Sequence, residues 1–244
     1  MRRKKSRITE DSWLIRRPVA HRGLFDDVAP ENSMAAYRKA VEKGVPIEMD
    51  VQLTRDLVPV CFHDDCLARM TGDSRMIGDV PFCELETLRL GGTEEKIPTF
   101  ADFLSFVGGR VPLLVEIKSR KDKKTISEIT AELLSGYRGE FAVQSFDPLI
   151  MAQFAKKNPG WLRGQLVDKG RHEGTVSPLV DFALRHTLFN FLSRPDFINL
   201  NVDYLPDDRA RKKRYLLCWT VRSEEDRRKA EEFADNFVYE KIRL

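Results

Sequence analysis

The feature that most constrains the fold is an alternation of short apolar runs with helix-like segments that continues almost to the end of the chain. The apolar runs have strand character, and strands are expected at 18–21, 46–53, 58–64, 111–119, 141–146, 162–168, 196–201, 215–221 and 236–240. Helices are expected at 32–44, 99–109, 124–137, 148–157, 177–189 and 224–234. Strands separated by helices of about 10–15 residues predict right-handed crossovers and a parallel sheet.

The length of 244 residues is close to the roughly 250 that an eight-fold β/α barrel needs. The chain has about eight such strands and no glycine-rich dinucleotide fingerprint. A single (β/α)8 barrel of the TIM type is therefore favoured over a doubly wound open sheet. We expect the barrel to occupy residues 18–244, preceded by a basic N-terminal extension over residues 1–17.

Residues 65–98 interrupt this alternation directly after the strand that ends at His63. They mix turn residues and charges with a short helical segment at 83–90, and we interpret them as an insertion. In a barrel, an insertion after a strand covers the active-site face. An ordinary long surface loop explains the same residues equally well.

The composition excludes several classes of protein. Lys and Arg total 41 against 38 Asp and Glu, a balance too even to indicate a nucleic-acid partner. The basic N-terminus is not followed by the apolar segment of a signal peptide, and no apolar run is long enough for stable membrane insertion. Cys61, Cys66, Cys83 and Cys218 form no CxxC pair, which predicts reduced, buried thiols in a cytoplasmic protein. A homo-oligomer is compatible with the sequence.

Two carboxylates occupy alternate positions in the expected strand 46–53. Glu48 and Asp50 are two residues apart, so they share one face with Cα atoms about 6.5 Å apart. Buried like charges at this separation are costly unless a divalent cation held by oxygen ligands neutralises them. The alternative is a strand end with two solvated acids.

The expected strand 111–119 repeats this spacing with opposite charges. Glu116 and Lys118 stand two residues apart in an otherwise apolar run. Glu116 would add a third oxygen ligand, and Lys118 a fixed positive charge. A buried structural salt bridge is the alternative.

Two of the four histidines, His21 and His63, stand at the carboxyl end of an expected strand, where barrel enzymes keep their catalytic groups. Imidazole accepts and donates protons near neutral pH, so two histidines can divide the roles of general base and general acid. Arg22 follows His21 directly, and its guanidinium suits a pair of phosphate oxygens.

These residues belong to motifs that follow one another in a fixed order. The motifs are His21-Arg22-Gly23, Pro30-Glu31-Asn32-Ser33, Glu48-Met49-Asp50, Thr54-x-Asp56, Pro59-Val60-x-x-His63-Asp64, Ile97-Pro98-Thr99-Phe100, Glu116-Ile117-Lys118, Gln144-Ser145-Phe146 and Trp219-Thr220-Val221. In order and spacing they resemble the glycerophosphodiester phosphodiesterase family over about residues 18–221. The resemblance implies a metal-dependent β/α barrel hydrolase, with 65–98 as the small insertion of the family.

Carried over position by position, the resemblance implies a role for each site residue. His21 and His63 would be the general base and acid pair, and Arg22 and Lys118 would hold the phosphate oxygens. Trp219 would line the pocket for the glycerol or the leaving group. The metal ligands would be Glu48, Asp50 and Glu116, with one Mg²⁺ or Ca²⁺ as cofactor.

Two positions depart from the family pattern. Leu57 stands where the family usually carries glycine, so we expect another turn geometry before Pro59. The last strand is followed only by the sequence KIRL, so we expect either a lower activity or closing contacts from elsewhere, such as residues 1–17.

The expected function is metal-dependent hydrolysis of a small glycerophosphodiester to sn-glycerol 3-phosphate and an alcohol. A lysophospholipase D-like or sphingomyelinase D-like activity on a lipid is the first alternative. It requires an apolar or membrane-docking surface, for which the sequence offers only the basic runs MRRKK and 207–214. A barrel that keeps the site as a non-catalytic binding module is the second alternative.

Overall fold

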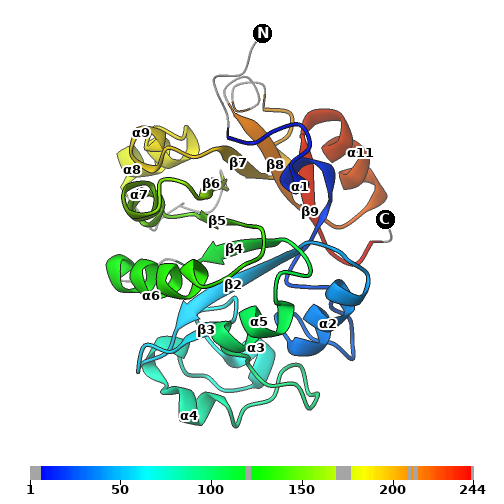
Figure 1. Ribbon diagram of the computed structural model, residues 1–244, viewed down its shortest axis with the longest axis vertical. Coiled ribbons are helices and arrows are strands. Elements are labelled where there is room, and N and C mark those ends of the chain that lie inside the picture. The colour runs from blue at the N-terminus through cyan, green and yellow to red at the C-terminus, as the bar shows by residue number, and fades with distance from the viewer. Residues whose placement is uncertain (1–6, 119–121, 169–176, 208–209, 211–213, 243–244) are drawn as a thin grey trace. The chain divides into compact units, whose positions relative to one another are not determined.

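A computed structural model of the chain describes residues 7–118, 122–168, 177–207, 210 and 214–242. These residues form two compact units (Figure 1). The 19–141 unit is continuous in sequence, whereas the 142–244 unit also includes the segment that precedes residue 19. Most of the basic residues in MRRKK and 207–214 lie outside the described residues.

The 19–141 unit contains three parallel strands, β1 (Val19–Ala20), β2 (Ile47–Leu53) and β4 (Leu113–Ile117). A fourth strand, β3 (Pro59–Cys61), pairs with β2 in the antiparallel direction, with Val51 opposite Cys61. The strand expected at 58–64 therefore follows a hairpin, in agreement with the turn expected before Pro59. The five residues between β2 and β3 suffice for a hairpin, but a parallel crossover needs a dozen or more.

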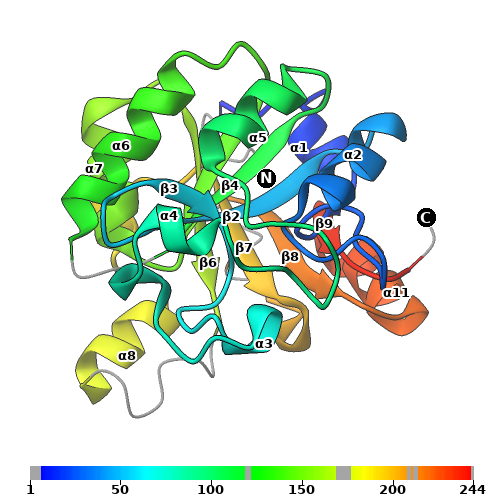
Figure 2. The ribbon, with the colours of Figure 1, turned by 90° about the horizontal axis from the view of Figure 1, so that it is seen from below.

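Three longer helices belong to this unit: α2 (Met34–Glu42), α5 (Phe100–Val107) and α6 (Lys123–Ser135) (Figure 2). Each begins at a side chain that accepts a hydrogen bond from a free backbone N–H, namely Ser33, Thr99 and Asp122. Asn32, the first residue of the expected helix 32–44, does not cap α2. Ser33 does, and Asn32 bonds to Asp50.

Residues 65–98 contain α3 (Ala68–Thr71), the 3-10 helix η1 (Ile77–Asp79) and α4 (Phe82–Leu85). The helix expected at 83–90 is thus shorter and begins one residue earlier. The segment has a small apolar core of its own, shared with Val60 and Phe62 beside β3: Leu67, Ile77, Val80, Leu85, Leu90 and Ile97. This packing gives the insertion a defined structure.

The 142–244 unit contains five strands, each parallel to the next: β5 (Phe141–Ser145), β6 (Leu162–Val167), β7 (Phe197–Asn201), β8 (Tyr215–Val221) and β9 (Asn236–Tyr239). Its helical segments are α1 (Trp13–Arg16), α7 (Pro148–Lys157), α8 (Pro178–Arg185), α9 (Asn190–Ser193), η2 (Val202–Tyr204) and α11 (Glu224–Phe233). Strand and helix therefore alternate here as the sequence predicts. The element order over both units is that of the expected (β/α)8 barrel, with β3 and residues 65–98 added after β2.

The N-terminal segment packs on the last strand. Trp13 and Leu14 are buried, and the side-chain amide of Asn236 in β9 donates to the carbonyls of Leu14 and Arg17 at 2.9 and 2.7 Å. Arg7 adds an ion pair to Asp196. The expectation that residues before the barrel contribute contacts at its end is confirmed for the described part of the segment.

Two further expectations concern the surface. Cys61 and Cys218 are buried as predicted, but Cys83 is exposed and Cys66 is partly exposed. Within the described ranges, no helix combines the length and the apolar character that a bilayer crossing demands.

Candidate active site and metal centre

Seven of the eight candidate site residues lie in the 19–141 unit, on β2 and β4 or just after β1, β3 and β4: His21, Arg22, Glu48, Asp50, His63, Glu116 and Lys118. The eighth, Trp219, lies on β8 in the 142–244 unit.

The turn after β1 fixes the start of the site. Arg22 and Gly23 both have positive φ, +55° and +84°, so the chain bends sharply after His21. A Cβ atom at position 23 would lie 3.0 Å from the backbone and from the Cβ atom of Ala36 in α2. This contact is too close for a side chain, and glycine has none. The Arg22 amide donates to Glu48 Oε2 at 3.1 Å. This close approach places His21, itself buried, beside β2.

Glu48, Asp50 and Glu116 form a carboxylate trio, as the sequence predicts. Glu48 and Asp50 share a face of β2, and the parallel register sets Asp50 opposite Glu116 on β4. One oxygen from each lies within 4.8 Å of the others, and all three residues are at most 6% exposed. Such a set of buried hard oxygen donors suits a divalent cation.

Lys118 lies against the trio. Its Nζ is 2.8 Å from Asp50 Oδ1 and 2.6 Å from Glu116 Oε1. The salt bridge that we weighed as an alternative is therefore present. It does not neutralise the cluster, because Lys118 brings one positive charge against three carboxylates and Arg22 is shared between Asp50 and Glu31.

The pKa values of Glu48 and Asp50 shift in opposite directions. Burial, followed by repulsion from Asp50 and Glu116, raises the pKa of Glu48 well above its ordinary value. Burial opposes ionisation of Asp50 as well, but Lys118, His63 and Arg22 outweigh it and hold the pKa of Asp50 low. Because Glu48 lacks sufficient positive charge nearby, a bound cation would complete the site.

Asn32 and Tyr37 support Asp50 from α2 and the turn before it. Asn32 Nδ2 donates to Asp50 Oδ2 at 2.8 Å, and the Tyr37 hydroxyl donates to Asn32 Oδ1 at 2.8 Å. All three side chains are almost fully buried. Sequence reasoning missed this contact because Asn32 stands at a position where a helix cap is the simplest explanation.

His63 reaches the site because β3 runs back along β2. The Phe62 amide donates to the Asp50 carbonyl at 3.2 Å, which sets the loop after β3 level with the trio. Gln52 Nε2 lies 3.1, 2.9 and 2.7 Å from the carbonyls of Phe62, His63 and Asp64. Gln52 was not predicted, although it shares the face of Glu48 and Asp50 at the next alternate position.

The hairpin before β3 turns at Leu57. Leu57 has φ +64°, in the left-handed region that glycine favours. The expectation of a turn geometry other than that of the family stays a prediction. Leu57 accepts this conformation at a cost in strain, and its side chain is half exposed.

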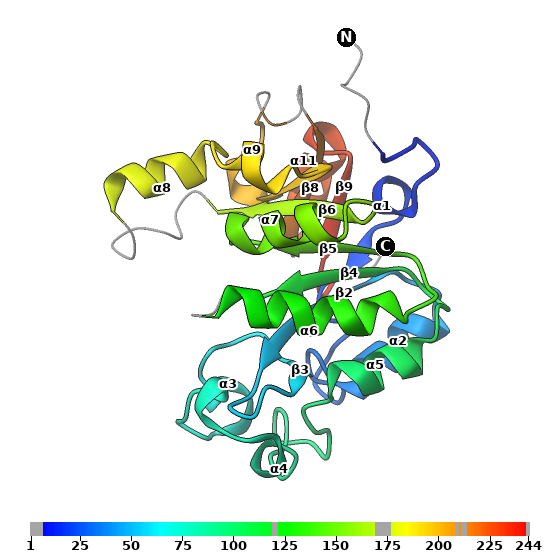
Figure 3. The same ribbon diagram turned by 60° about the vertical axis from the view of Figure 1, so that its left-hand side comes forward.

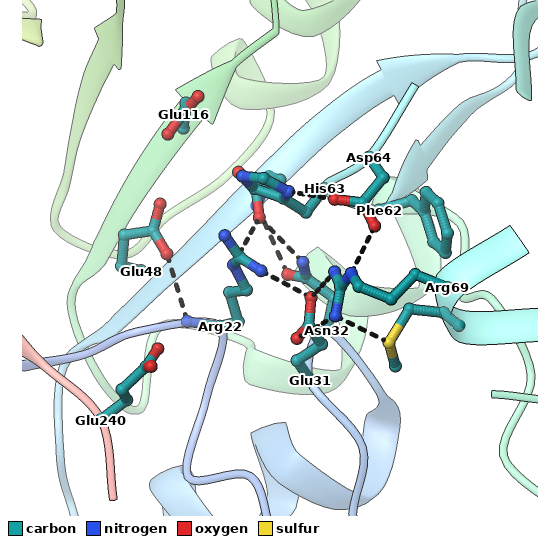
Figure 4. A network of polar contacts seen from close by, with 12 residues as sticks. Arg22, Glu31, Asn32, Glu48, Phe62, His63, Asp64, Arg69, Glu116 and Glu240 are labelled. Carbon is teal, nitrogen blue, oxygen red and sulfur yellow. Dashed lines mark hydrogen bonds and ion pairs between the residues drawn. The ribbon is translucent and has the colours of Figure 1, made fainter. Parts of the chain in front are cut away.

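An unpredicted chain of charged side chains connects Arg22 to His63 (Figure 4). Arg22 Nη1 donates to Glu31 Oε1 at 2.6 Å, and both oxygens of Glu31 accept from Arg69 in the insertion. Arg69 Nε donates to Asp64 Oδ2 at 2.6 Å, and Asp64 Oδ1 is 2.6 Å from His63 Nδ1. The insertion thus contacts both polar loops of the site.

Trp219 packs edge to face on Phe146, with ring centroids 5.5 Å apart and planes at 81°. Its indole Nε1 is buried and makes no hydrogen bond to any of the residues that the structure describes. A buried indole N–H normally has a partner, so this donor is available to a ligand.

Comparison with known proteins decides the family. The model of the glycerophosphoryl diester phosphodiesterase family matches residues 21–236. The chain belongs to this family. It is 34% identical to YhdW of Bacillus subtilis over 154 residues, which are 58% of this chain and 61% of that protein. It is 38% identical to the glycerophosphodiester phosphodiesterase of Caldanaerobacter subterraneus over 41% of this chain and 44% of that one. These matches span less than two thirds of the two relatives.

The fold of the family agrees with the element order. A phosphodiesterase from Oleispira antarctica, solved in complex with the product sn-glycerol-3-phosphate, superposes with a TM-score of 0.77 at 22% identity. The superposition covers 91% of this chain and 92% of that structure. The chain therefore has the (β/α)8 barrel fold predicted from its sequence.

Proposed function

We propose that this protein hydrolyses glycerophosphodiesters to sn-glycerol 3-phosphate and an alcohol with the help of one divalent cation, Mg²⁺ or Ca²⁺. The observation that carries the proposal is the cluster in the 19–141 unit, where three buried carboxylates lie beside Lys118, with Arg22 and His63 bonded into the same network. Membership in the family and the product-bound neighbour support the same substrate class.

Glu48, Asp50 and Glu116 would hold the cation. When bound, the cation supplies positive charge that polarises the phosphoryl group and stabilises the negative charge of the transition state. Arg22 and Lys118 are held next to the trio by ion pairs to Asp50, so both are placed to share the phosphate oxygens.

His21 and His63 would act as general base and general acid. One deprotonates the attacking hydroxyl, and the other protonates the departing alcohol. Because His63 Nδ1 is engaged by Asp64, its Nε2 is the nitrogen left for the substrate. In the 142–244 unit, the unsatisfied Nε1 of Trp219 supports a role in binding the glycerol or the leaving group.

The test is hydrolysis of glycerophosphocholine and glycerophosphoethanolamine with Mg²⁺, with Ca²⁺ and with chelator. We expect release of glycerol 3-phosphate that requires the cation. His21→Ala should abolish turnover without unfolding the protein. His186→Ala is the matched control, since His186 lies in the 142–244 unit and bonds to the Phe182 carbonyl. Absence of cation-dependent release from either substrate would reject the proposal, and near wild-type rates for His21→Ala would reject its role.

A specific surface favours the lipid alternative. Six large apolar side chains on and between α8 and α9 are at least 38% exposed: Leu179, Val180, Phe182, Leu188, Phe191 and Leu192. Figure 3 shows α8 extending beyond α7 and β6 of the same unit. Exposed apolar patches of this kind mark protein or membrane contacts. A lipid–water interface that contains lysophospholipids would bury these exposed apolar side chains.

Lysophosphatidylcholine, as monomers and in vesicles, separates the two substrate classes. If the surface serves a lipid substrate, the double variant Phe182→Ser/Phe191→Ser should lose vesicle binding and turnover of lysophosphatidylcholine. Its rate on glycerophosphocholine should not change. Equal rates of wild type and variant on vesicles would reject this second function. We also propose that the protein is cytoplasmic, a proposal that its four unpaired cysteines support.

A further inference from the structure

We propose that Arg69 of the insertion is a positioning residue, which holds the Asp64 carboxylate so that it fixes the imidazole of His63. The inference rests on the proposed function, because His63 is its general acid or base. It assigns the insertion a part in catalysis: a side chain from residues 65–98 sets the orientation of a catalytic group that follows β3.

The guanidinium of Arg69 is itself firmly placed. Two of its nitrogens bind the two oxygens of Glu31 at 2.9 and 2.6 Å, which is the bidentate geometry that arginine forms with a carboxylate. Glu31 is only 12% exposed and is held from the other side by Arg22. The two-point anchor leaves Arg69 Nε as the donor directed at Asp64.

Asp64 transmits this position to His63. Its Oδ2 accepts from Arg69, and its Oδ1 bonds to His63 Nδ1, so the carboxylate is fixed at both oxygens. Gln52 holds the backbone carbonyls of the same loop. With the backbone fixed, the rotation of the Asp64 carboxylate and of the His63 ring is the remaining freedom, and Arg69 removes it. A partner on Nδ1 also sets the tautomer, since Nε2 then carries the lone pair of the neutral ring.

A purely structural role would have other consequences. The Arg69 side chain is 48% exposed, and ion pairs of exposed arginines contribute little to folding stability. Arg75 offers a matched comparison in the same insertion. It is 47% exposed and also binds two carboxylates, Asp73 and Glu84, neither of which contacts a candidate site residue.

The experiment compares Arg69→Gln, Arg69→Lys and Arg75→Gln with wild type on glycerophosphocholine. We expect Arg69→Gln to lower kcat by about 10- to 100-fold, as loss of supporting groups does at other sites, while its melting temperature stays within about 3 °C of wild type. Arg69→Lys should recover only part of the rate, because an ammonium cannot bind Glu31 at two points and Asp64 at a third. Arg75→Gln should retain wild-type kcat.

A double-mutant cycle distinguishes positioning from general disturbance. If Arg69 acts through His63, the variant His63→Ala/Arg69→Gln should be no slower than His63→Ala alone. The ¹⁵N shifts of the His63 ring give a readout that needs no turnover: one tautomer in wild type and in Arg75→Gln, and a mixture in Arg69→Gln. The inference would be overturned if the losses of kcat in the two single variants multiply in the double variant, if kcat is unchanged in Arg69→Gln, or if the His63 tautomer is unchanged in Arg69→Gln. Failure of wild type to cleave any substrate would reject the proposed function and leave the tautomer measurement to decide the position of His63.

Discussion

Replacing Glu48 by glutamine removes one negative charge from the carboxylate trio and keeps its shape, including an acceptor for the Arg22 amide. Two carboxylates 4.8 Å apart repel by about 3.5 kcal/mol at an effective dielectric constant of about 20. Glu48 faces two such neighbours, and their repulsion together with burial outweighs the attraction of Arg22 and Lys118. Without a cation, ionised Glu48 therefore destabilises the folded protein.

The size of this effect has an upper bound. The ordinary pKa of the carboxyl is 4.5, so keeping Glu48 protonated at about pH 7 costs about 3.4 kcal/mol. The cost of an ionised Glu48 cannot exceed this amount, because the folded protein would then bind the proton instead. Glu48→Gln should therefore stabilise the cation-free protein by between about 1 and 3 kcal/mol, a rise in melting temperature of roughly 2–12 °C. The stabilisation should vanish as the pH falls below about 4.5, since the wild-type carboxyl is then protonated in both the folded and the unfolded protein.

Calorimetry with chelator and with Mg²⁺ or Ca²⁺ measures both halves of the argument. Cation at about 100 times its Kd should stabilise wild type by about 2.7 kcal/mol and Glu48→Gln by much less, because a ligand is missing. Glu94→Gln, with a fully exposed side chain in the same unit, is the control and should leave both values unchanged. The reasoning is refuted if Glu48→Gln lowers the stability of the cation-free protein, or if the cation stabilises wild type and variant equally.

Three further predictions concern the turns and the acid limb of stability. Leu57→Gly should raise the melting temperature by roughly 2–4 °C, because glycine adopts the left-handed conformation about 1 kcal/mol more easily than leucine does. An unchanged or lower melting temperature would show that Leu57 is not strained. Gly23→Ala should lower the free energy of unfolding in urea by about 2 kcal/mol, because the new Cβ atom would lie 3.0 Å from Ala36 at a residue with φ +84°. An unchanged free energy of unfolding would show that α2 shifts at little cost. Lys118 is the largest of the attractions that lower the pKa of Asp50. The ionised Asp50 therefore stabilises the folded protein at pH values above 3.8, the ordinary pKa of the group. Wild type should lose this contribution as pH falls below that value, and Asp50→Asn should show a shallower acid limb in urea unfolding; identical limbs would contradict it.

Local pattern sufficed for much of the fold. The segments 148–157 and 215–221 form the helix α7 and the strand β8 with the predicted ends. Helical spacing, strand-like apolar runs and turn residues act within a few residues, so the sequence expresses them directly. The short connection between 46–53 and 58–64 is local in the same way, and β3 runs antiparallel to β2 after a tight turn.

Part of the site was equally local. Alternation along β2 is enough to place Glu48 and Asp50 on one face, whatever the rest of the chain does. The same rule extends to Gln52, whose three carbonyl contacts became evident only once β3 was folded back along β2.

Local pattern thus accounts for most strands and helices outside residues 65–98, for the family to which the motifs point, and for the pairing of charges two residues apart. Which distant side chains meet depends on tertiary packing. Arg69 joins Glu31, 38 residues away, because the insertion folds around its own apolar core and delivers α3 to the loop after β1. The physical reason is that such contacts depend on packing between segments, and packing leaves no periodic trace in the residues that it brings together.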